Sequence, residues 1–345
     1  MVEDREKFGA EELAIVLSHY DLGAIRSIRE FVRGSRKAPK VAVDCERGRF
    51  LLKRRTTTPE GLKKIVFTHE IQLRLAGQNF PLPHLTGTRN ENNSMLVREP
   101  YVYELFEFIR GEGYDGSLDA TYNAGKILAL YHKLMNGFSG SYTPPTGSYH
   151  GSKAIHQAVG NTVRKLPEEA RPTKEVLAGA VKDLEGAYVE CAKRVNKAGL
   201  KEWGRQIVHG DWHPGNMLFR ERHVVAVIDY DSARQQQRVI DIANGSLQFS
   251  ILGGTDDPSR WPENIDESRF KRFLLGYDSV NVISKAELHV VPPLMCEAMI
   301  AEAVLPIAIT GSFGQFEGFP FLQMIQRKVR WILDHQKHLE DILGE

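Results

Sequence analysis

The sequence has few of the features that mark secreted, metal-binding or nucleic-acid-binding proteins. Its 345 residues include only three cysteines, Cys45, Cys191 and Cys296, which have neither metal-site spacing nor the even number of a disulfide framework. The 45 lysines and arginines nearly balance the 44 acids, so a net charge of +1 gives no overall attraction to nucleic acid or anionic membrane. The composition therefore predicts a cytoplasmic protein that binds neither nucleic acid nor membrane.

Long apolar runs are also missing. The first residues, MVEDREKFGAEEL, carry acids where a signal peptide has basic residues followed by an apolar stretch. The most apolar later segment, MIAEAVLPIAIT, contains Glu302 and Pro306 and is shorter than the roughly 20 residues that span a bilayer. With 42% hydrophobic and 26% charged residues, the chain is expected to be soluble and globular. Its length suits two domains or one two-lobed enzyme.

The first hundred residues predict a small sheet with one main helix. Two runs rich in Val, Phe and Leu within residues 41–53 flank a short turn and indicate a β-hairpin. A helix is expected over residues 59–76, between a Thr-Pro-Glu start and a closing glycine. The segments 95–98 and 101–109 are predicted to be two more strands.

The remainder of the chain is predicted to be mostly helical. Three short β runs, RQIVH, NMLFR and VVAVID, interrupt the helical part near its middle. A hairpin embedded in a helical region must be stabilised by its surroundings, which draws attention to that segment. Helices are expected over residues 119–135, 173–198, 240–251, 286–305 and 321–343.

The segment VHGDWHPGNMLFRERHVVAVIDYDSA carries the chemistry. If its two strands pair across a turn near Arg222 and His223, Asn216 lies opposite Asp229 or one residue out of register. An amide and a carboxylate at one end of a hairpin are suitable oxygen ligands for Mg²⁺. Asp211, in the preceding loop, is placed to accept a proton from a hydroxyl. The spacing is that of a kinase-type phosphoryl-transfer site.

These motifs resemble the aminoglycoside phosphotransferase and choline kinase-like superfamily. HGDWHPGN matches the pattern H-G-D-x-H-x-x-N, and IDYD matches I-D-[YFW]-[DE]. The segments YDLGAIRSIREF and GRFLLKR indicate the homoserine kinase, spore-coat and stress-response kinase branch. The resemblance implies an α+β, bilobed protein kinase-like fold. A small antiparallel-sheet lobe with one main helix would bind nucleotide over residues 1–108, and a larger, mostly helical lobe would occupy residues 109–345.

The resemblance also implies a role for each polar residue of the motif. Asp211 would be the catalytic base, and Asn216 and Asp229 would bind the Mg²⁺ of Mg·ATP. Three further residues would support the catalytic loop, namely His209, His213 and Asp241.

Nucleotide-binding residues are expected in the first lobe. Lys53 ends a predicted strand where the family places the lysine that contacts the α- and β-phosphates, and Arg54 and Arg55 compete for that role. The loop that covers the phosphates is predicted at Gly34 and Ser35, whose backbone N–H groups and hydroxyl are donors. The hinge that reads adenine through backbone groups is expected near residues 104–109.

Glu70 is the expected partner of Lys53. It lies 17 residues later, beside the apolar stripe that Leu62, Val66 and Leu73 form on the predicted helix. An acid at that position could reach a cleft. Glu60 is the rival and is better explained as a first-turn acid at the positive end of the helix.

The predicted function is Mg·ATP-dependent phosphorylation of a hydroxyl on a small molecule such as an amino alcohol, homoserine, a sugar or an aminoglycoside. A protein Ser/Thr kinase and a non-catalytic coat or binding protein are the alternatives. Only eleven residues, 230–240, separate Asp229 from Asp241, which is short for the activation segment of a protein kinase. A small-molecule acceptor is therefore favoured.

The acceptor is not specified further, and no oligomeric state is indicated. A cationic acceptor would need acids in the second lobe, and an acidic one would need basic residues. The candidates are Asp231, Glu297 and Glu302 for the first kind and Arg234, Arg238 and Arg327 for the second.

Overall fold

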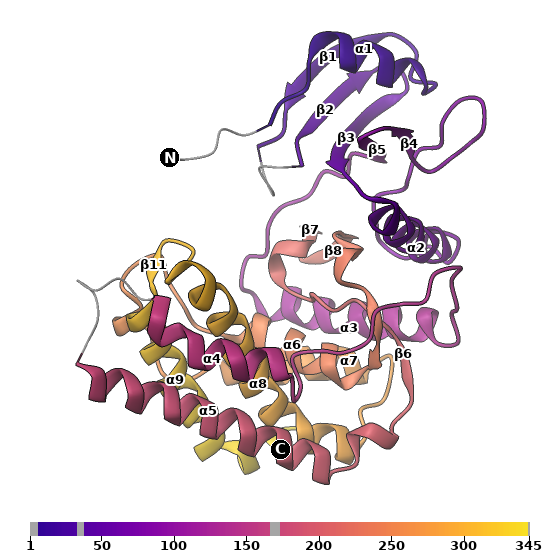
Figure 1. Cartoon of the computed structure of the whole chain (residues 1–345). Coiled ribbons are helices and arrows are strands. Elements are labelled where there is room, and N and C mark those ends of the chain that lie inside the picture. Colours follow the sequence, from indigo (N-terminus) through magenta and orange to yellow (C-terminus); the bar gives the residue numbers. More distant parts are fainter. Residues whose placement is uncertain (1–5, 33–37, 166–172, 344–345) are drawn as a thin grey trace.

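The computed structural model, which describes residues 6–32, 38–165 and 173–343, contains two lobes (Figure 1). An antiparallel sheet and α2 form the N-terminal lobe, and most helices lie in the larger C-terminal lobe. The chain passes from one lobe to the other between β5 and α3. The predicted α+β, bilobed fold is therefore confirmed.

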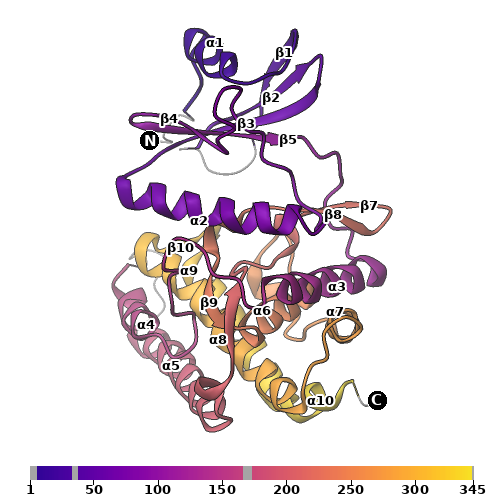
Figure 2. The same cartoon turned by 90° about the vertical axis from the view of Figure 1, so that its right-hand side faces the viewer.

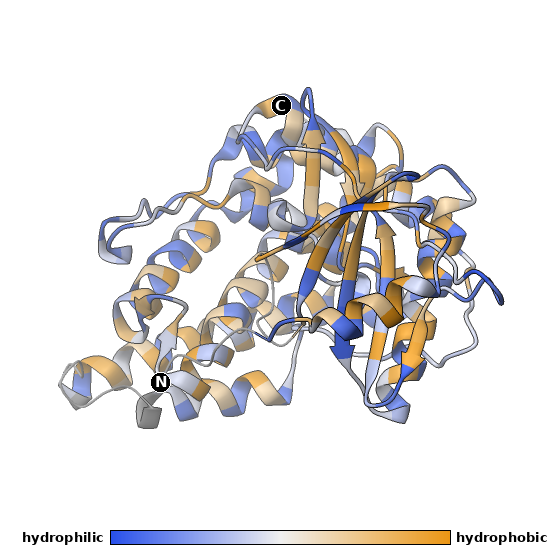
Figure 3. Ribbon diagram, turned by 90° about the horizontal axis from the view of Figure 1, so that it is seen from above, coloured by the Kyte–Doolittle hydropathy of each residue, from blue (hydrophilic) through white to orange (hydrophobic). Residues whose placement is uncertain are grey.

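The N-lobe sheet has the order β1-β2-β3-β5-β4. Its strands are β1 (Ile25–Glu30), β2 (Lys40–Cys45), β3 (Gly48–Thr56), β4 (Leu96–Arg98) and β5 (Tyr101–Glu107). The hairpin β2–β3 was predicted, whereas β1 and the helix α1 (Ala10–Ser18) were not. β1 is an edge strand of sequence IRSIRE with one partly buried residue, so it lacks the apolar alternation of a half-buried strand. Figure 3 shows hydrophobic residues running along the central strands.

The main N-lobe helix, α2 (Pro59–Ala76), has the predicted bounds but a different buried face. Thr58 caps its start by accepting the Gly61 N–H at 3.1 Å. Leu73 is 54% exposed, so its place in the predicted apolar stripe is wrong. The buried face includes Phe67, Ile71 and Leu75, which belong to the hydrophobic core of the C-lobe. Figure 2 shows why, because α2 lies across the molecule between the sheet and the C-lobe.

The C-lobe is helical with short β pairs. Its helices are α3 (Leu118–Met135), α4 (Lys153–Lys165), α5 (Lys174–Lys197), α6 (Val239–Ser250), α7 (Glu267–Asp278), α8 (Lys285–Thr310), α9 (Gly318–Asp334) and α10 (Gln336–Asp341). Its paired strands are β6 (Arg205–Val208) with β9 (Arg234–Gln237), β7 (Met217–Arg220) with β8 (His223–Val227), and β10 (Ser312–Phe313) with β11 (Phe316–Glu317). The sequence prediction missed α4 and α7.

The central helix of the C-lobe is α8. It has 26 residues and continues through Pro306, where the sequence predicted its end. Its mean hydropathy of 1.6 and its length are sufficient for a membrane span, but 83% of its apolar window is buried inside the protein. Such burial is typical of the core helix of a globular domain.

Helices α3 and α7 pack closely because glycines lie at their contact. A side chain at Gly276 would collide with the backbone carbonyl oxygen of Tyr122, and one at Gly125 would collide with that of Phe273. Backbone atoms cannot move aside as a flexible side chain can. The two glycines therefore permit the close approach of the helices.

We expect Gly276→Ala to destabilise the protein by about 1–3 kcal/mol, since the added methyl group must push α7 away from α3. Denaturant unfolding measures the change. The matched control is Gly186→Ala in α5, where a methyl group meets no neighbouring atom within 4 Å and should stabilise the helix by up to about 1 kcal/mol. Equal effects of the two substitutions would contradict the close packing.

Candidate active site

The loop between β6 and β7 holds the HGDWHPGN motif, and a buried carboxylate anchors it. Asp241, in the first turn of α6, accepts the backbone N–H groups of His209 at 2.7 Å and Gly210 at 2.9 Å. Gly210 has φ +79°, and a side chain there would collide with the carbonyl oxygen of Ser232. Only glycine fits this turn. The contacts of Asp241 are those that its predicted supporting role requires.

His209 lies in the aromatic interior beneath the loop. Its ring centre is 5.3 Å from that of Trp212, 5.2 Å from that of Tyr230 and 6.0 Å from that of Tyr131. Burial lowers the pKa of His209, although the nearby Asp241 opposes this effect. A buried imidazole packed on three rings fits the supporting role predicted for His209.

His213 connects the loop to the acid that precedes it. Its Nδ1 accepts the Gly215 N–H at 3.0 Å and so caps the short 3₁₀ turn η3 (Pro214–Asn216). Its Nε2 lies 3.5 Å from Oδ2 of Asp211. This geometry fits the bracing role predicted for His213.

Asp211 and Asn216 are held together. The Asn216 Nδ2 group donates to the Asp211 carbonyl oxygen at 3.0 Å and to Asp211 Oδ2 at 2.9 Å. Burial raises the pKa of Asp211, but the hydrogen bonds from His213 and Asn216 outweigh it and leave the pKa below its ordinary value. Asp211 is therefore an ionised, oriented carboxylate at neutral pH, as proton acceptance requires.

The hairpin after the loop has a register one residue away from the direct pairing of Asn216 with Asp229. Its turn residues are Glu221 and Arg222, both with positive φ, whereas the sequence prediction placed the turn at Arg222 and His223. The backbone carbonyl oxygen of Asn216 consequently accepts the Ile228 N–H at 3.0 Å. Asp229, the predicted metal ligand, follows with φ 64°. This left-handed conformation ends the regular alternation of side chains along the strand.

Asn216 and Asp229 fit a divalent cation that arrives with a nucleotide. The Nδ2 group of Asn216 is occupied by Asp211, so its amide oxygen is the atom available to a metal. The Asp229 carboxylate makes no hydrogen bond or ion pair within the described residues. Those residues also contain no cluster of three or more His, Cys, Asp or Glu side chains. Two hard oxygen ligands, completed by phosphate and water, suit Mg²⁺.

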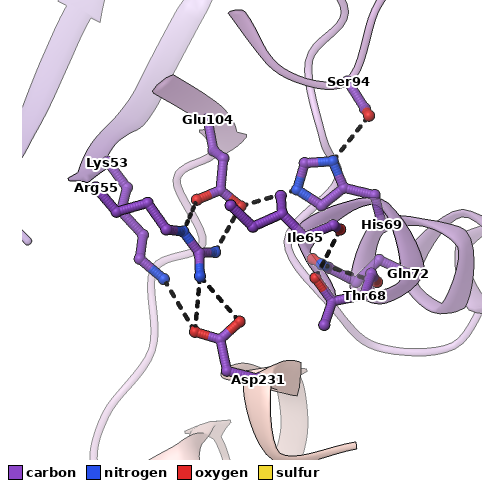
Figure 4. A network of polar contacts seen from close by, with 9 residues as sticks. All are labelled: Lys53, Arg55, Ile65, Thr68, His69, Gln72, Ser94, Glu104 and Asp231. Carbon is purple, nitrogen blue, oxygen red and sulfur yellow. Dashed lines mark hydrogen bonds and ion pairs between the residues drawn. The ribbon is translucent and has the colours of Figure 1, made fainter. Parts of the chain in front are cut away.

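The strand β3 carries three consecutive cations with different surroundings (Figure 4). Lys53 and Arg55 point to the same side, and both contact Asp231 in the 3₁₀ turn η4 (Tyr230–Ser232) of the C-lobe. Lys53 Nζ is 3.8 Å from the Asp231 carboxylate. Arg54 points to the opposite side and binds Glu12 and Glu6 at 2.8–2.9 Å. Arg54 is therefore no rival for the phosphate-binding role.

A buried acid on β5 completes this network. The Glu104 carboxylate accepts hydrogen bonds from Arg55 at 2.7 and 2.8 Å and is 2.8 Å from His69 Nε2. The other ring nitrogen of His69 is 2.8 Å from the Ser94 hydroxyl. Burial would raise the pKa of Glu104, but His69, Arg55 and Lys53 together hold it far below its ordinary value.

The sequence analysis missed Glu104 because it assigned residues 104–109 to a hinge read through backbone groups. In the structure β5 extends to Glu107, so Glu104 lies inside the sheet and its side chain is buried. One signal was present. Glu104 is a lone acid in the apolar strand YVYELF, and buried acids need a charged partner.

The predicted pairing of Lys53 with Glu70 is not found. The Glu70 carboxylate accepts the Ser141 N–H at 2.9 Å, and the ion pair of Lys53 is with Asp231. The physical reason is which face of α2 meets the sheet, because His69, not Glu70, contacts Glu104 of β5. The predicted phosphate-loop residues Gly34 and Ser35 lie outside the described residues.

Most of the residues predicted to bind the acceptor molecule are instead bonded to other groups of the protein. Glu297 is buried against His150 and Gly151, and Asp231 is held by Arg55. Arg238 binds Glu287 at 2.7 and 2.8 Å. Arg234 and Arg327 donate hydrogen bonds to backbone carbonyl groups.

Glu302 of α8 remains close to the catalytic loop. Its carboxylate accepts a hydrogen bond from Gln248 at 2.6 Å. Glu302 is exposed to solvent, although neighbouring protein atoms partly desolvate its carboxylate. This desolvation and the negative charge of Asp211 raise the pKa of Glu302 to about 7, against the opposing effects of Gln248 and His213. A cation bound nearby would therefore stabilise the ionised form of Glu302.

Comparison with known proteins identifies the fold. Three solved structures illustrate it. An aminoglycoside phosphotransferase from Alicyclobacillus acidocaldarius is 16% identical, with a TM-score of 0.67 over 100% of this chain and 98% of that one. Amicoumacin kinase in complex with AMP-PNP and Ca²⁺ is 12% identical, with a TM-score of 0.64 over 94% of each chain. A microcompartment-associated aminopropanol kinase is 13% identical, with a TM-score of 0.64 over 96% and 99%.

Similarity at these identities establishes the fold, and the family follows from the sequence. Comparison with curated protein sequences gives no match. The model of the phosphotransferase enzyme family matches residues 28–281, which include β3, the catalytic loop and Asp241. Since this match extends over more than half of the chain, the protein belongs to the phosphotransferase enzyme family.

Proposed function

We propose that the protein transfers the γ-phosphate of ATP to a hydroxyl group of a small molecule, with Mg²⁺ as the metal. The observation that supports this most directly is the unit formed by Asp211, Asn216 and Asp229. It combines an ionised, oriented carboxylate with two oxygen ligands that have no competing partner. Phosphoryl transfer needs little else from the protein than positioning and charge stabilisation.

In this mechanism the acceptor hydroxyl donates a hydrogen bond to Asp211. Its oxygen attacks the γ-phosphorus, its proton passes to the Asp211 carboxylate, and ADP leaves. Asn216 and Asp229 would hold Mg²⁺, which supplies positive charge at the phosphates. Lys53 is the side chain proposed to contact the α- and β-phosphates, since its one ion pair with the described residues is long at 3.8 Å.

The segment after Asp229 supports a small acceptor over a protein. It forms η4 and then β9, which pairs with β6 directly beside the catalytic loop. The loop after α3 lies against β9, because Gln235 N–H donates to the Pro145 carbonyl group at 3.0 Å. An extended peptide that bound by pairing with β9 would find this edge occupied.

Glu302 supports an acceptor that carries an amino group beside its hydroxyl group. An ammonium ion near Glu302 would bind the ionised carboxylate while its hydroxyl reaches Asp211. The similar structures include an aminopropanol kinase and an aminoglycoside phosphotransferase, whose names specify compounds of that kind. A cytoplasmic location is proposed as well, since Cys45, Cys191 and Cys296 are all free and buried.

Asp211→Asn should reduce kcat by about 10²–10⁴, because it removes the proton acceptor while keeping the shape of the side chain. The assay is ADP release across a panel of amino alcohols, aminoglycosides, sugars and homoserine, with Mg·ATP affinity measured by titration. Affinity should change little. The control is Asp119→Asn, an exposed acid on α3, which should keep wild-type turnover. If Asp211→Asn retained full activity, Asp211 would not be the catalytic base.

Nucleotide binding should require a divalent cation. Mg·ATP at 100 times its dissociation constant should stabilise the protein by about 2.7 kcal/mol, whereas ATP with excess chelator should stabilise it far less. Thermal melting under both conditions measures the difference. Asp229→Asn should remove most of this difference in stabilisation, since the variant loses the charged ligand of the metal. The metal assignment fails if ATP protects wild type equally well in chelator.

The raised pKa of Glu302 predicts a pH-dependent loss of stability. The folded protein binds the proton more tightly than the unfolded chain, whose glutamate titrates near 4.5, so ionising Glu302 costs stability as pH rises through about 7. From about pH 5 to about pH 8, wild type should lose stability relative to Glu302→Gln. Melting curves against pH test this.

The control for this measurement is Glu263→Gln, which removes a carboxylate from an exposed loop position. Its stability should follow that of wild type at every pH. Parallel curves for wild type and Glu302→Gln would instead show that the cleft does not perturb Glu302.

A further inference from the structure

Two carboxylates compete for the amino group of Lys53. Asp231 contacts it at 3.8 Å from the C-lobe. Glu104 lies directly across the β3–β5 ladder from Lys53 and is fully buried. A firm ion pair with Asp231 would hold the Lys53 ammonium group toward the C-lobe. A second cation that binds Asp231 and the buried Glu104 would prevent this.

Arg55 contacts both acids at once (Figure 4). Its Nε and one terminal nitrogen bind the two Glu104 oxygens at 2.7 and 2.8 Å. Its other terminal nitrogen binds the two Asp231 oxygens at 2.9 and 3.0 Å. These four charge-assisted bonds use two edges of the planar guanidinium group, which a lysine ammonium group cannot reproduce.

We propose that Arg55 is a positioning residue that holds Glu104 and Asp231 so that Lys53 remains available to the phosphates of the nucleotide. The inference rests on the proposed function, because it presumes that Lys53 binds nucleotide. Arg55 itself has no need to touch the nucleotide. Its partner Asp231 is two residues beyond Asp229, so the same contact also fixes the turn that carries the candidate metal ligand.

The remaining contacts of Glu104 make the arrangement rigid. His69 approaches Glu104 from α2 and is itself fixed by Ser94. Arg55, Glu104 and His69 have side-chain exposures of 18%, 1% and 2%, so bulk water does not replace these bonds. The network therefore joins β3, β5 and α2 of the N-lobe to η4 of the C-lobe.

A second substitution, at Asp231, should restore the nucleotide binding that is lost when Arg55 is replaced. Without Arg55, the Asp231 carboxylate has Lys53 as its nearest cation and should bind it. Arg55→Gln should then weaken binding of a non-hydrolysable ATP analogue with Mg²⁺ by about tenfold or more. Adding Asp231→Asn removes the competing charge, so the double variant should recover most of the affinity. A purely structural role of Arg55 would not produce recovery.

The experiment is isothermal titration of wild type, Arg55→Gln, Asp231→Asn and the double variant with the analogue and Mg²⁺. The matched control is Arg54→Gln, the neighbouring arginine that also binds two glutamates but on the opposite side of β3. It should bind the analogue like wild type. The proposal is overturned if Arg55→Gln binds within twofold of wild type, or if the double variant binds no better than Arg55→Gln.

Two further arms separate the possible causes of failure. If wild type itself does not bind the analogue, the proposed function fails and not the role of Arg55. Melting curves show whether Arg55→Gln folds with Glu104 left buried. If it does not fold, Arg55→Lys retains a positive charge beside Glu104 but cannot bridge both acids. It should show the same weakened binding and the same recovery with Asp231→Asn.

Discussion

The buried carboxylate of Asp241 is the contact on which the geometry of the catalytic loop depends. It accepts two successive backbone N–H groups, from His209 and Gly210, and is 3.3 Å from His132 Nε2. His132 is in turn 2.8 Å from the Tyr277 hydroxyl. The loop is also fixed by apolar packing, since Trp212 is fully buried and His209 lies among three aromatic rings. Its polar anchor is provided by α6, with α3 and α7 packed against that helix.

Above the loop, ion pairs join the two lobes in addition to the apolar contact of α2 with the C-lobe core. Asp231 belongs to the C-lobe, and its two cationic partners belong to β3. Ion pairs at the edge of a cleft can be exchanged for pairs with phosphate, whereas a packed apolar contact would have to be broken. The arrangement of Lys53 and Arg55 on one side of β3 therefore suits a cleft that must admit and release a highly charged ligand.

The degree to which the site was predictable differs between its two halves. The catalytic loop and hairpin are contiguous in sequence, so local spacing was enough to group Asp211, Asn216 and Asp229 as candidates, with one error in the position of the turn. The nucleotide side is built from three separate segments. Glu70 was selected because it lies beside the predicted apolar stripe of α2, but α2 packs into the C-lobe core and presents His69 to the network instead.

The sequence by itself determined the two-lobed class of fold, the helix α2 with its caps, and the identity of the residues in the HGDWHPGN and IDYD motifs. These features depend on local preferences and on residues close together in the chain. Only the tertiary structure decided which acid faces β3, which arginine joins the lobes, and which carboxyl group lies beside Asp211. Those contacts join residues up to 176 positions apart, as in the pair Arg55 and Asp231, and they depend on how helices rotate to bury their apolar faces.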